Sequence, residues 1–184
     1  MRLAMSLNLK IRKYPDEILR KEAKIVENPE DYLDLIKEMK KTMIENDGIG
    51  LAAPQVGFSI RIITLHSEVL KKDFKNDIKG DFIPDNLINP KVLFYKGEIS
   101  GEEGCLSFPG LFIEIPRPQF VVLKGLTFIN KKLIELEIEV QNLPARVFLH
   151  EIDHLNGILF IDRLKPSERK IILAKWIKQQ KIKI

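Results

Sequence analysis

The stretch PARVFLHEIDHLN (residues 144–156) decides how the rest of the chain is interpreted. Pro144 at the start of this stretch is typical of a helix start, and Gly157, directly after its end, is typical of a helix stop. On that predicted helix, His150 and His154 lie one turn apart on the same face. Two imidazoles at this spacing can bind one cation, and Glu151 can reach a water on that cation. The stretch therefore predicts a central helix that carries a metal site.

Two histidines leave the ligand set incomplete, because a catalytic centre usually takes three protein ligands. The extended pattern of many metallopeptidases needs a third histidine at position 160, where this chain has Phe160. Cys105, in the glycine-flanked segment EEGCLS (residues 102–107), is the best candidate, although its spacing leaves an inert buried cysteine equally open. His66 is a poorer candidate, since it follows a predicted strand on a polar stretch. A thiolate with two imidazoles suits Fe²⁺, Zn²⁺, Ni²⁺ or Co²⁺ rather than Mg²⁺ or Ca²⁺.

Length and composition are those of an ordinary globular protein. The 184 residues are 45% hydrophobic and 30% charged, which suits one domain with a real core over residues 1–184. The single cysteine excludes an intrachain disulfide and fits a reducing compartment. No signal peptide or membrane-spanning stretch is visible, so we expect a cytoplasmic protein of bacterial type with neither a membrane nor DNA as partner.

Hydrophobic periodicity predicts an α+β fold, with antiparallel sheets packed around the central helix, an N-terminal helix and a C-terminal helix. The N-terminal helix is expected at residues 28–46, with Met39 and Met43 as core residues. The glycine-rich stretch GIGLAAPQVG (48–57) is expected to be an ordered loop. Strands are expected at 60–65, 92–99, 120–129 and 133–140, an exposed excursion at 66–86, and a last helix from 166 through 176.

The end of the chain is basic. Residues 165–184 carry seven Lys or Arg and one Glu, a net +6 within a chain whose net charge is +4. Such a helix or tail can favour nucleic acid or an anionic surface. A solvated helix face with lysines for solubility is the plainer alternative.

Three segments, taken in order, resemble the peptide deformylase family. They are GIGLAAPQ (48–55), EGCLS (103–107) and HEIDH (150–154). The resemblance covers roughly residues 11–165. It implies a metal-dependent hydrolase that removes the formyl group from the N-terminal formylmethionine of new polypeptides. It also implies Cys105 as the third ligand of one divalent ion, usually Fe²⁺, for which Ni²⁺, Co²⁺ or Zn²⁺ can substitute.

The resemblance implies roles for further residues. Glu151 is expected to take a proton from water and give it to the leaving amine, while the Gln55 side chain and the Leu106 backbone N–H stabilise the oxyanion. Backbone groups near Ile49, Gly50 and Gly104 are expected to hold the peptide as an added strand. The methionine pocket is expected to involve the apolar side chains of Ile49, Leu111 and Val147, for each of which plain core packing is equally open. Charge and residue type suggest that Arg117 pairs with Glu103 and braces the cysteine segment.

Two other functions remain open at this point. A metallopeptidase that cuts internal peptide bonds would share the His-Glu-x-x-His helix, but Phe160 and the missing downstream glutamate argue against it. A non-catalytic ribosome-binding homologue would use the basic C-terminal helix, but the intact Gln55, Leu106 and Glu151 argue against loss of activity. We keep a ribosome contact through that helix as a secondary expectation, because nascent chains emerge there.

Overall fold

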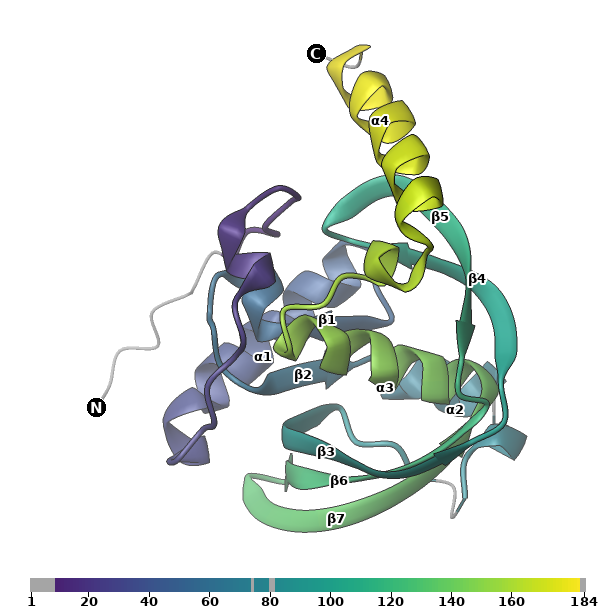
Figure 1. The fold of residues 1–184 in the computed structure, drawn as a ribbon. Helices are drawn as coiled ribbons and strands as arrows, with labels where there is room; N and C mark the ends of the chain where they lie inside the picture. Colours follow the sequence, from purple (N-terminus) through teal and green to yellow (C-terminus); the bar gives the residue numbers. More distant parts are fainter. Residues whose placement is uncertain (1–8, 74, 80–81, 183–184) are drawn as a thin grey trace.

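The computed structural model describes residues 9–73, 75–79 and 82–182, which form an α+β architecture (Figure 1). The strands are β1 (Gly50–Ala52), β2 (Ile62–Leu65), β3 (Asn86–Lys96), β4 (Ile99–Cys105), β5 (Phe108–Arg117), β6 (Phe120–Ile129) and β7 (Lys132–Gln141). The α-helices are α1 (Leu33–Glu45), α2 (Ser67–Asp73), α3 (Asn142–Leu155) and α4 (Pro166–Ile182). Short 3-10 turns are η1 (Glu17–Arg20), η2 (Pro29–Tyr32), η3 (Ala53–Val56), η4 (Lys75–Asp77) and η5 (Phe160–Arg163).

Two antiparallel sheets surround the central helix, as predicted. Within the described residues, one sheet has five strands in the order β1-β2-β3-β6-β7 and the other is the pair β4-β5. Helix α3 runs through the middle of the molecule with the curved five-stranded sheet on one side and the long β4-β5 pair on the other (Figure 1). The two sheets share no hydrogen-bonded ladder within the described ranges. Two-residue connections join β3 to β4 and β5 to β6, and away from these connections side-chain contacts hold the sheets together.

The apolar residues whose spacing predicted α1 and β7 are packed as expected. Met39 and Met43 of α1 are fully buried, because their helical spacing places both on the face that meets the core. In β7, Ile138 and Val140 face the core, and the intervening glutamates lie on the other face. The strand predicted at 120–129 coincides with β6.

Three predictions needed correction. The strand expected at 92–99 begins earlier, at Asn86, and ends at Lys96. The β4-β5 pair was not predicted, because glycines and prolines interrupt its apolar pattern, although Leu111, Ile113 and Ile115 alternate with exposed residues in β5. The segment 66–86 is not simply an exposed excursion.

That segment contains α2 and contributes to the core. Leu70, Ile78 and Ile83 are buried in the same hydrophobic cluster as α3. Three apolar side chains spread over fourteen residues show no helical or strand period, which is why the sequence suggested an exposed stretch. The glycine-rich segment 48–57 is irregular as predicted and resolves into the short strand β1 and the turn η3.

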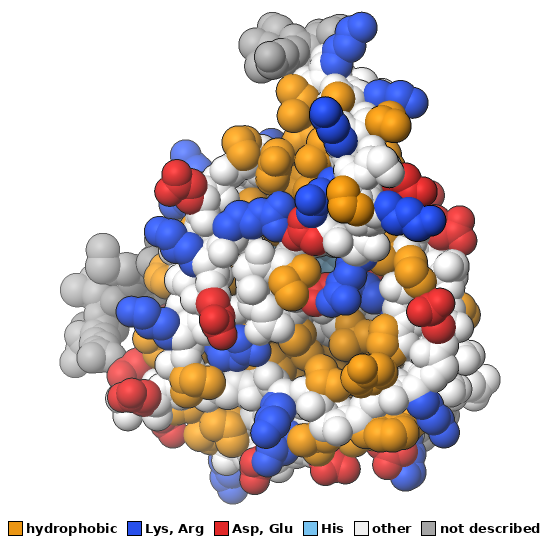
Figure 2. Space-filling view, in the orientation of Figure 1, with side chains coloured by type: hydrophobic (Ala, Val, Ile, Leu, Met, Phe, Trp, Pro, Cys, Tyr) orange, Lys and Arg blue, Asp and Glu red, His pale blue; other side chains and the backbone are white. Residues whose placement is uncertain are grey.

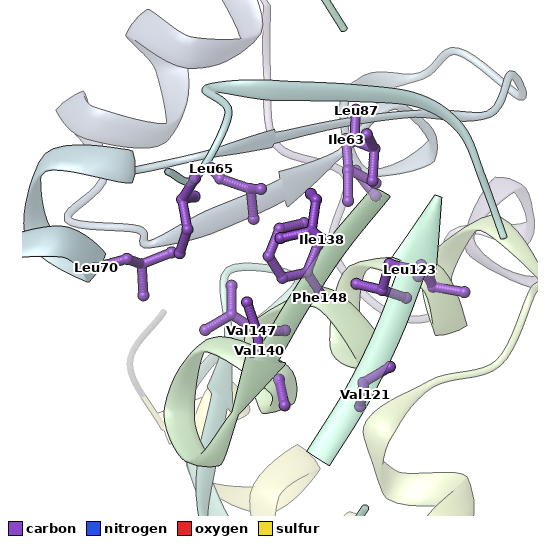
Figure 3. Close-up of a cluster of buried hydrophobic side chains, with 14 of the residues drawn as sticks. Ile63, Leu65, Leu70, Leu87, Val121, Leu123, Ile138, Val140, Val147 and Phe148 are labelled. Carbon is purple, nitrogen blue, oxygen red and sulfur yellow. The ribbon is translucent and has the colours of Figure 1, made fainter. Parts of the chain in front are cut away.

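The core consists of three hydrophobic clusters. The first lies between α3 and the five-stranded sheet, where Phe148 of α3 lies beside Ile138 of β7 (Figure 3). The second joins α1 to β1 and β2, and the third joins β5 to η5 and α4. Cys105 packs against the third cluster and Leu106 against the second, so the predicted site stands where the clusters meet.

Helix α4 extends beyond the body of the protein but is anchored to it (Figure 1). Its Trp176 is buried in the third cluster, against Phe108 of β5. Lysines and arginines alternate with hydrophobic side chains over the rest of this helix (Figure 2). Lys183, which counts toward the basic tail, lies outside the described residues. Among the residues that are described, no helix is long and apolar enough to cross a bilayer.

Candidate metal centre

The three predicted ligands converge from two elements. His150 and His154 lie on one face of α3, with ring centroids 5.1 Å apart, and Cys105 is the last residue of β4. Cys105 Sγ is 3.2 Å from His154 Nε2. One ligand atom from each of the three residues lies within 4.8 Å of the other two. Cys105 is thus beside the histidines and not an isolated core residue.

A buried carboxylate orients the first histidine. His150 Nδ1 donates a hydrogen bond to Glu103 Oε2 at 2.8 Å, so Nε2 is the ring nitrogen that can bind an ion. Metal-binding histidines usually have such a partner on the second ring nitrogen. The predicted pairing is also confirmed, since Arg117 donates to both Glu103 oxygens, at 2.7 and 2.9 Å. Burial alone would raise the pKa of Glu103, but the hydrogen bonds from Arg117 and His150 hold it well below its ordinary value.

Sequence reasoning missed two further members of this buried network. Arg146 of α3 donates to Glu103 Oε1 at 2.8 Å. Asp153 accepts hydrogen bonds from Arg117 at 2.5 Å and from Arg163 at 2.5 and 3.1 Å. Their spacing gave one signal: residues 146, 150 and 153 are three or four apart and therefore share a face of α3.

The residues fit a borderline-soft divalent cation. The donor set is one thiol and two imidazoles, the combination typical of Fe²⁺, Co²⁺, Ni²⁺ or Zn²⁺ sites. Burial lowers the pKa of His154 well below its ordinary value, so this ring is neutral, as a ligand must be. Buried His154 Nδ1 and Glu151 Oε2 have no hydrogen-bond partner among the described residues, an unusual state for buried polar atoms.

Glu151 lies beside the two histidines and is itself almost completely buried, with an exposed fraction of 4%. Burial raises the pKa of Glu151 to about 7. Gly50 of β1 passes directly over this carboxylate, because a Cβ built on Gly50 would lie 2.5 Å from Glu151 Oε1. The carboxylate therefore occupies the space where a side chain at position 50 would otherwise be.

Gln55 and Leu106 border the ligands from the other side. Gln55 lies on η3, where its Oε1 accepts a hydrogen bond from the Ala52 N–H at 2.8 Å. This bond directs its Nε2 toward Cys105 Sγ, 3.5 Å away, and toward Ser107 Oγ, 3.3 Å away. Leu106 follows Cys105 and lines the same cavity.

A cavity of about 610 Å³ opens above these groups. Its lining includes most of the residues proposed from the sequence, namely Ile49, Gly50, Gln55, Gly104, Cys105, Leu106, Leu111, Val147, His150 and Glu151. Val147 and Leu111 are largely buried and belong to core clusters, and both also line the cavity. Their packing in the core therefore does not exclude a place in the pocket wall. Phe112 closes over Gly104, where a Cβ would lie 2.5 Å from its ring.

Two other candidate positions lie outside the ligand group. His66 contributes no atom to the Cys105, His150 and His154 group. Phe160, at the position where a longer metallopeptidase pattern needs a histidine, is buried against Phe108, and its ring centroid is 5.7 Å from that of His150. It fills the core behind the ligands.

Fold and site together define the class of protein: an α+β protein with a candidate Cys-His-His metal centre beside a cleft. The sequence profile described as polypeptide deformylase matches residues 8–170. The chain belongs to the polypeptide deformylase family.

Relatives and solved structures agree with this assignment. The chain is 42% identical over 169 residues to a peptide deformylase of Thermodesulfovibrio yellowstonii, covering 91% of this chain and 96% of the relative. It is 48% identical over 154 residues to that of Clostridium botulinum, covering 83% and 94%. A crystal structure of a peptide deformylase from Legionella pneumophila superposes with a TM-score of 0.79 at 38% identity, covering 95% and 96% of the two chains. One from Ehrlichia chaffeensis gives a TM-score of 0.81 at 33% identity, covering 95% and 98%.

Proposed function

We propose that this chain, as a single catalytic domain, removes the formyl group from the N-terminal formylmethionine of newly made polypeptides. The observation that supports the proposal is the convergence of Cys105, His150 and His154 next to a cleft, in a member of this family. Cys105, His150 and the neighbouring Glu151 line that cleft. The reaction hydrolyses an amide bond and releases formate and a free amine.

Cys105, His150 and His154 would hold one divalent ion, which we propose to be Fe²⁺, with Ni²⁺, Co²⁺ or Zn²⁺ able to substitute. When bound, such an ion supplies Lewis acidity, which polarises a carbonyl oxygen and makes a water molecule more acidic. Glu103 contributes by holding the His150 ring through Nδ1, at 2.8 Å. His150 and His154 are buried, whereas Cys105 is partly exposed and lines the cleft together with His150.

Glu151 is the proposed proton carrier. A carboxylate whose pKa is about 7 can accept a proton from the attacking water and later donate it to the leaving nitrogen at neutral pH. Its Oε2, which has no hydrogen-bond partner in the described part of the chain, is the atom that would hold this proton between the two steps.

Gln55 and Leu106 are the proposed oxyanion donors. The Nε2–H of Gln55 and the backbone N–H of Leu106 would donate to the oxygen that becomes negative when the formyl carbon turns tetrahedral. Since the Ala52 N–H fixes the Gln55 amide through its Oε1, the donor is oriented before the reaction. Losing one preorganised donor of this kind typically costs about 3 kcal/mol of barrier.

The peptide would lie along the cleft as an added strand. We propose that the backbone groups of Ile49 and Gly50 on one wall and Gly104 on the other bind its main chain. Ile49, Leu111 and Val147 would receive the methionine side chain, since all three line the cavity. Main-chain binding leaves residues after the methionine free to vary.

The decisive assay compares two substrates. The metal-loaded protein should release formate from an N-formylmethionyl tripeptide and leave the peptide bonds of an unblocked protein intact. Cleavage of internal peptide bonds would instead support a metallopeptidase. No formate from the loaded enzyme would refute the proposed function.

Helix α4 is a proposed contact for the ribosome, because its exposed lysines suit ribosomal RNA. Deleting the helix is a poor test, since Trp176 belongs to the core. Replacing exposed Lys170, Lys175 and Lys178 with Glu should weaken salt-sensitive cosedimentation with ribosomes, whereas the same change at Lys37 and Lys41 of α1 should not. Equal binding by both variants would exclude α4 as the contact.

A further inference from the structure

Arg146 has a set of hydrogen bonds that its neighbours on α3 do not share. Its Nη1 donates to the backbone carbonyl oxygens of Gly101 at 3.1 Å and Ile115 at 2.8 Å, and its Nη2 donates to that of Ile99 at 2.7 Å. One guanidinium on the central helix thus joins the backbones of β4 and β5. The fourth bond, to Glu103, joins it to the network around His150.

These bonds matter because of how the cleft is built. One wall is the β1 side, which belongs to the five-stranded sheet, and the other wall is β4, which is paired only with β5 in the described part of the chain. The β4 wall therefore has no ladder to hold it at a fixed distance from α3. Glu103 and Cys105 attach it to α3 through side chains near its end, whereas Arg146 attaches the backbone itself at 99 and 101.

Gly101 gives a second, independent observation. A Cβ built on Gly101 would lie 3.0 Å from Arg146 Nη2, 3.2 Å from Cζ and 3.3 Å from Nε. The guanidinium plane lies flat against this glycine, and any side chain there would push it away. The absence of a side chain at 101 and the presence of the arginine at 146 are thus two parts of one contact.

Arg146 is also too buried to be a surface charge. Its exposed fraction is 6%, and its charge faces Glu103 and three carbonyl oxygens. A buried guanidinium is costly unless its donors are satisfied. Three of its four contacts come from Nη1, whose two N–H groups must share them, and the fourth comes from Nη2. Together they hold the group against β4 and β5 at the edge of the cavity.

We propose that Arg146 is a positioning residue that, with Gly101, sets the distance between the β4 wall of the cleft and α3. It acts on peptide binding through the β4 backbone and not on the reacting atoms. The inference rests on the proposed function, in which the peptide lies against β4. It assigns to Arg146 an effect on KM larger than its effect on kcat.

The test uses two variants that disturb the contact from opposite sides. Arg146→Gln removes the guanidinium, and Gly101→Ala keeps it but displaces it. Both should raise KM for an N-formylmethionyl tripeptide about tenfold, the effect of roughly one lost charged hydrogen bond, and should lower kcat by a smaller factor. Arg146→Lys keeps the positive charge but has fewer hydrogen-bond donors, so its KM should lie between those of the wild type and Arg146→Gln. Amide hydrogen exchange of residues 99–104 should accelerate in the first two variants.

Arg61→Gln is the matched control. Arg61 also donates to a backbone carbonyl of α3, that of Leu155 at 3.4 Å, but it does not line the cavity. Its loss should leave KM unchanged. A fall in kcat with unchanged KM, or a loss of thermal stability with both constants unchanged, would overturn the proposal for Arg146. If the wild-type enzyme releases no formate, the proposed function fails, and tripeptide affinity and the exchange rates then decide the role of Arg146.

Discussion

Trp176 of α4 donates a hydrogen bond from its indole Nε1–H to the carbonyl oxygen of Pro109, at 3.1 Å. Gln180, one turn further along, donates to the same oxygen at 3.2 Å. Pro109 lines the cleft, four residues after Cys105. The helix that the sequence suggested as a basic tail is thus attached to the rim of the candidate active site.

Trp176→Ala should lower the free energy of unfolding by about 3 kcal/mol, because a buried aromatic side chain leaves a cavity. Urea unfolding followed by circular dichroism measures this loss. Ile177→Ala, one residue along and exposed, is the control and should change stability by less than about 0.5 kcal/mol. Equal losses would mean that the indole contributes no more than a surface residue does.

Glu151→Gln should keep the shape of the site and lower formate release about a thousandfold, because an amide cannot carry the proton. Bound metal, measured by elemental analysis, should stay at the wild-type level. If the variant keeps activity within about tenfold of wild type, Glu151 is not the proton carrier.

Gly50→Ala should act through Glu151. Its methyl group would lie 2.5 Å from Glu151 Oε1 and 2.9 Å from Cγ, so the carboxylate must move. A displacement of this size typically costs about a hundredfold in kcat. The double variant Gly50→Ala/Glu151→Gln should be no worse than Glu151→Gln alone. Additive losses would show that Gly50 acts by another route.

The single cysteine allows a direct test of the ligand set. In the metal-free protein a thiol-specific disulfide reagent should modify Cys105, and Zn²⁺ or Co²⁺ should slow the reaction strongly. His154→Ala should abolish this protection, since its Nε2 is 3.2 Å from Cys105 Sγ. Reaction at the same rate with saturating ion would remove Cys105 from the ligands.

Asp162 predicts an acid-sensitive part of the stability. Burial alone would raise the pKa of Asp162, but hydrogen bonds from Arg20 and the Leu159 N–H outweigh it and hold the pKa below its ordinary value of 3.8. A carboxyl whose pKa is lower in the folded state stabilises the protein above its unfolded-state pKa, and this contribution is lost as the pH falls through the folded-state pKa.

Asp162→Asn should therefore reduce the free energy of unfolding most at neutral pH. The difference from wild type should shrink as the pH is lowered below 3.8. Asp34→Asn, at an exposed position on α1, controls for the loss of one negative charge. A difference that is constant across this range would show that the ionised form of Asp162 is not what stabilises the fold.

The sequence predicted those parts of the molecule in which a local pattern and the packing agree. The alternation of β7 and the i, i+4 histidines of α3 each determine a face, so burial and ligand convergence followed from them. Charge and residue type were enough to pair Arg117 with Glu103.

The features that depend on distant contacts could not be predicted. Arg146 reaches carbonyl oxygens that are 31 to 47 residues away, and no local pattern identifies such acceptors. The burial of Leu70 within a polar segment likewise depends on the sheet and helix that cover it. Cys105 is an intermediate case. Its spacing did not distinguish a metal ligand from an inert buried cysteine, whereas the family motif around it favoured a ligand.

Cys105 and Leu106 are consecutive residues that pack against different hydrophobic clusters. The peptide bond between them is consequently held by both clusters. Neither residue can move without disturbing the cluster against which it packs. Many enzymes lose activity on heating before they unfold, because the active site lies in the least stable part of the fold. In this protein the proposed oxyanion donor and the thiol share one clamped peptide unit, so thermal inactivation and global unfolding should follow the same temperature curve.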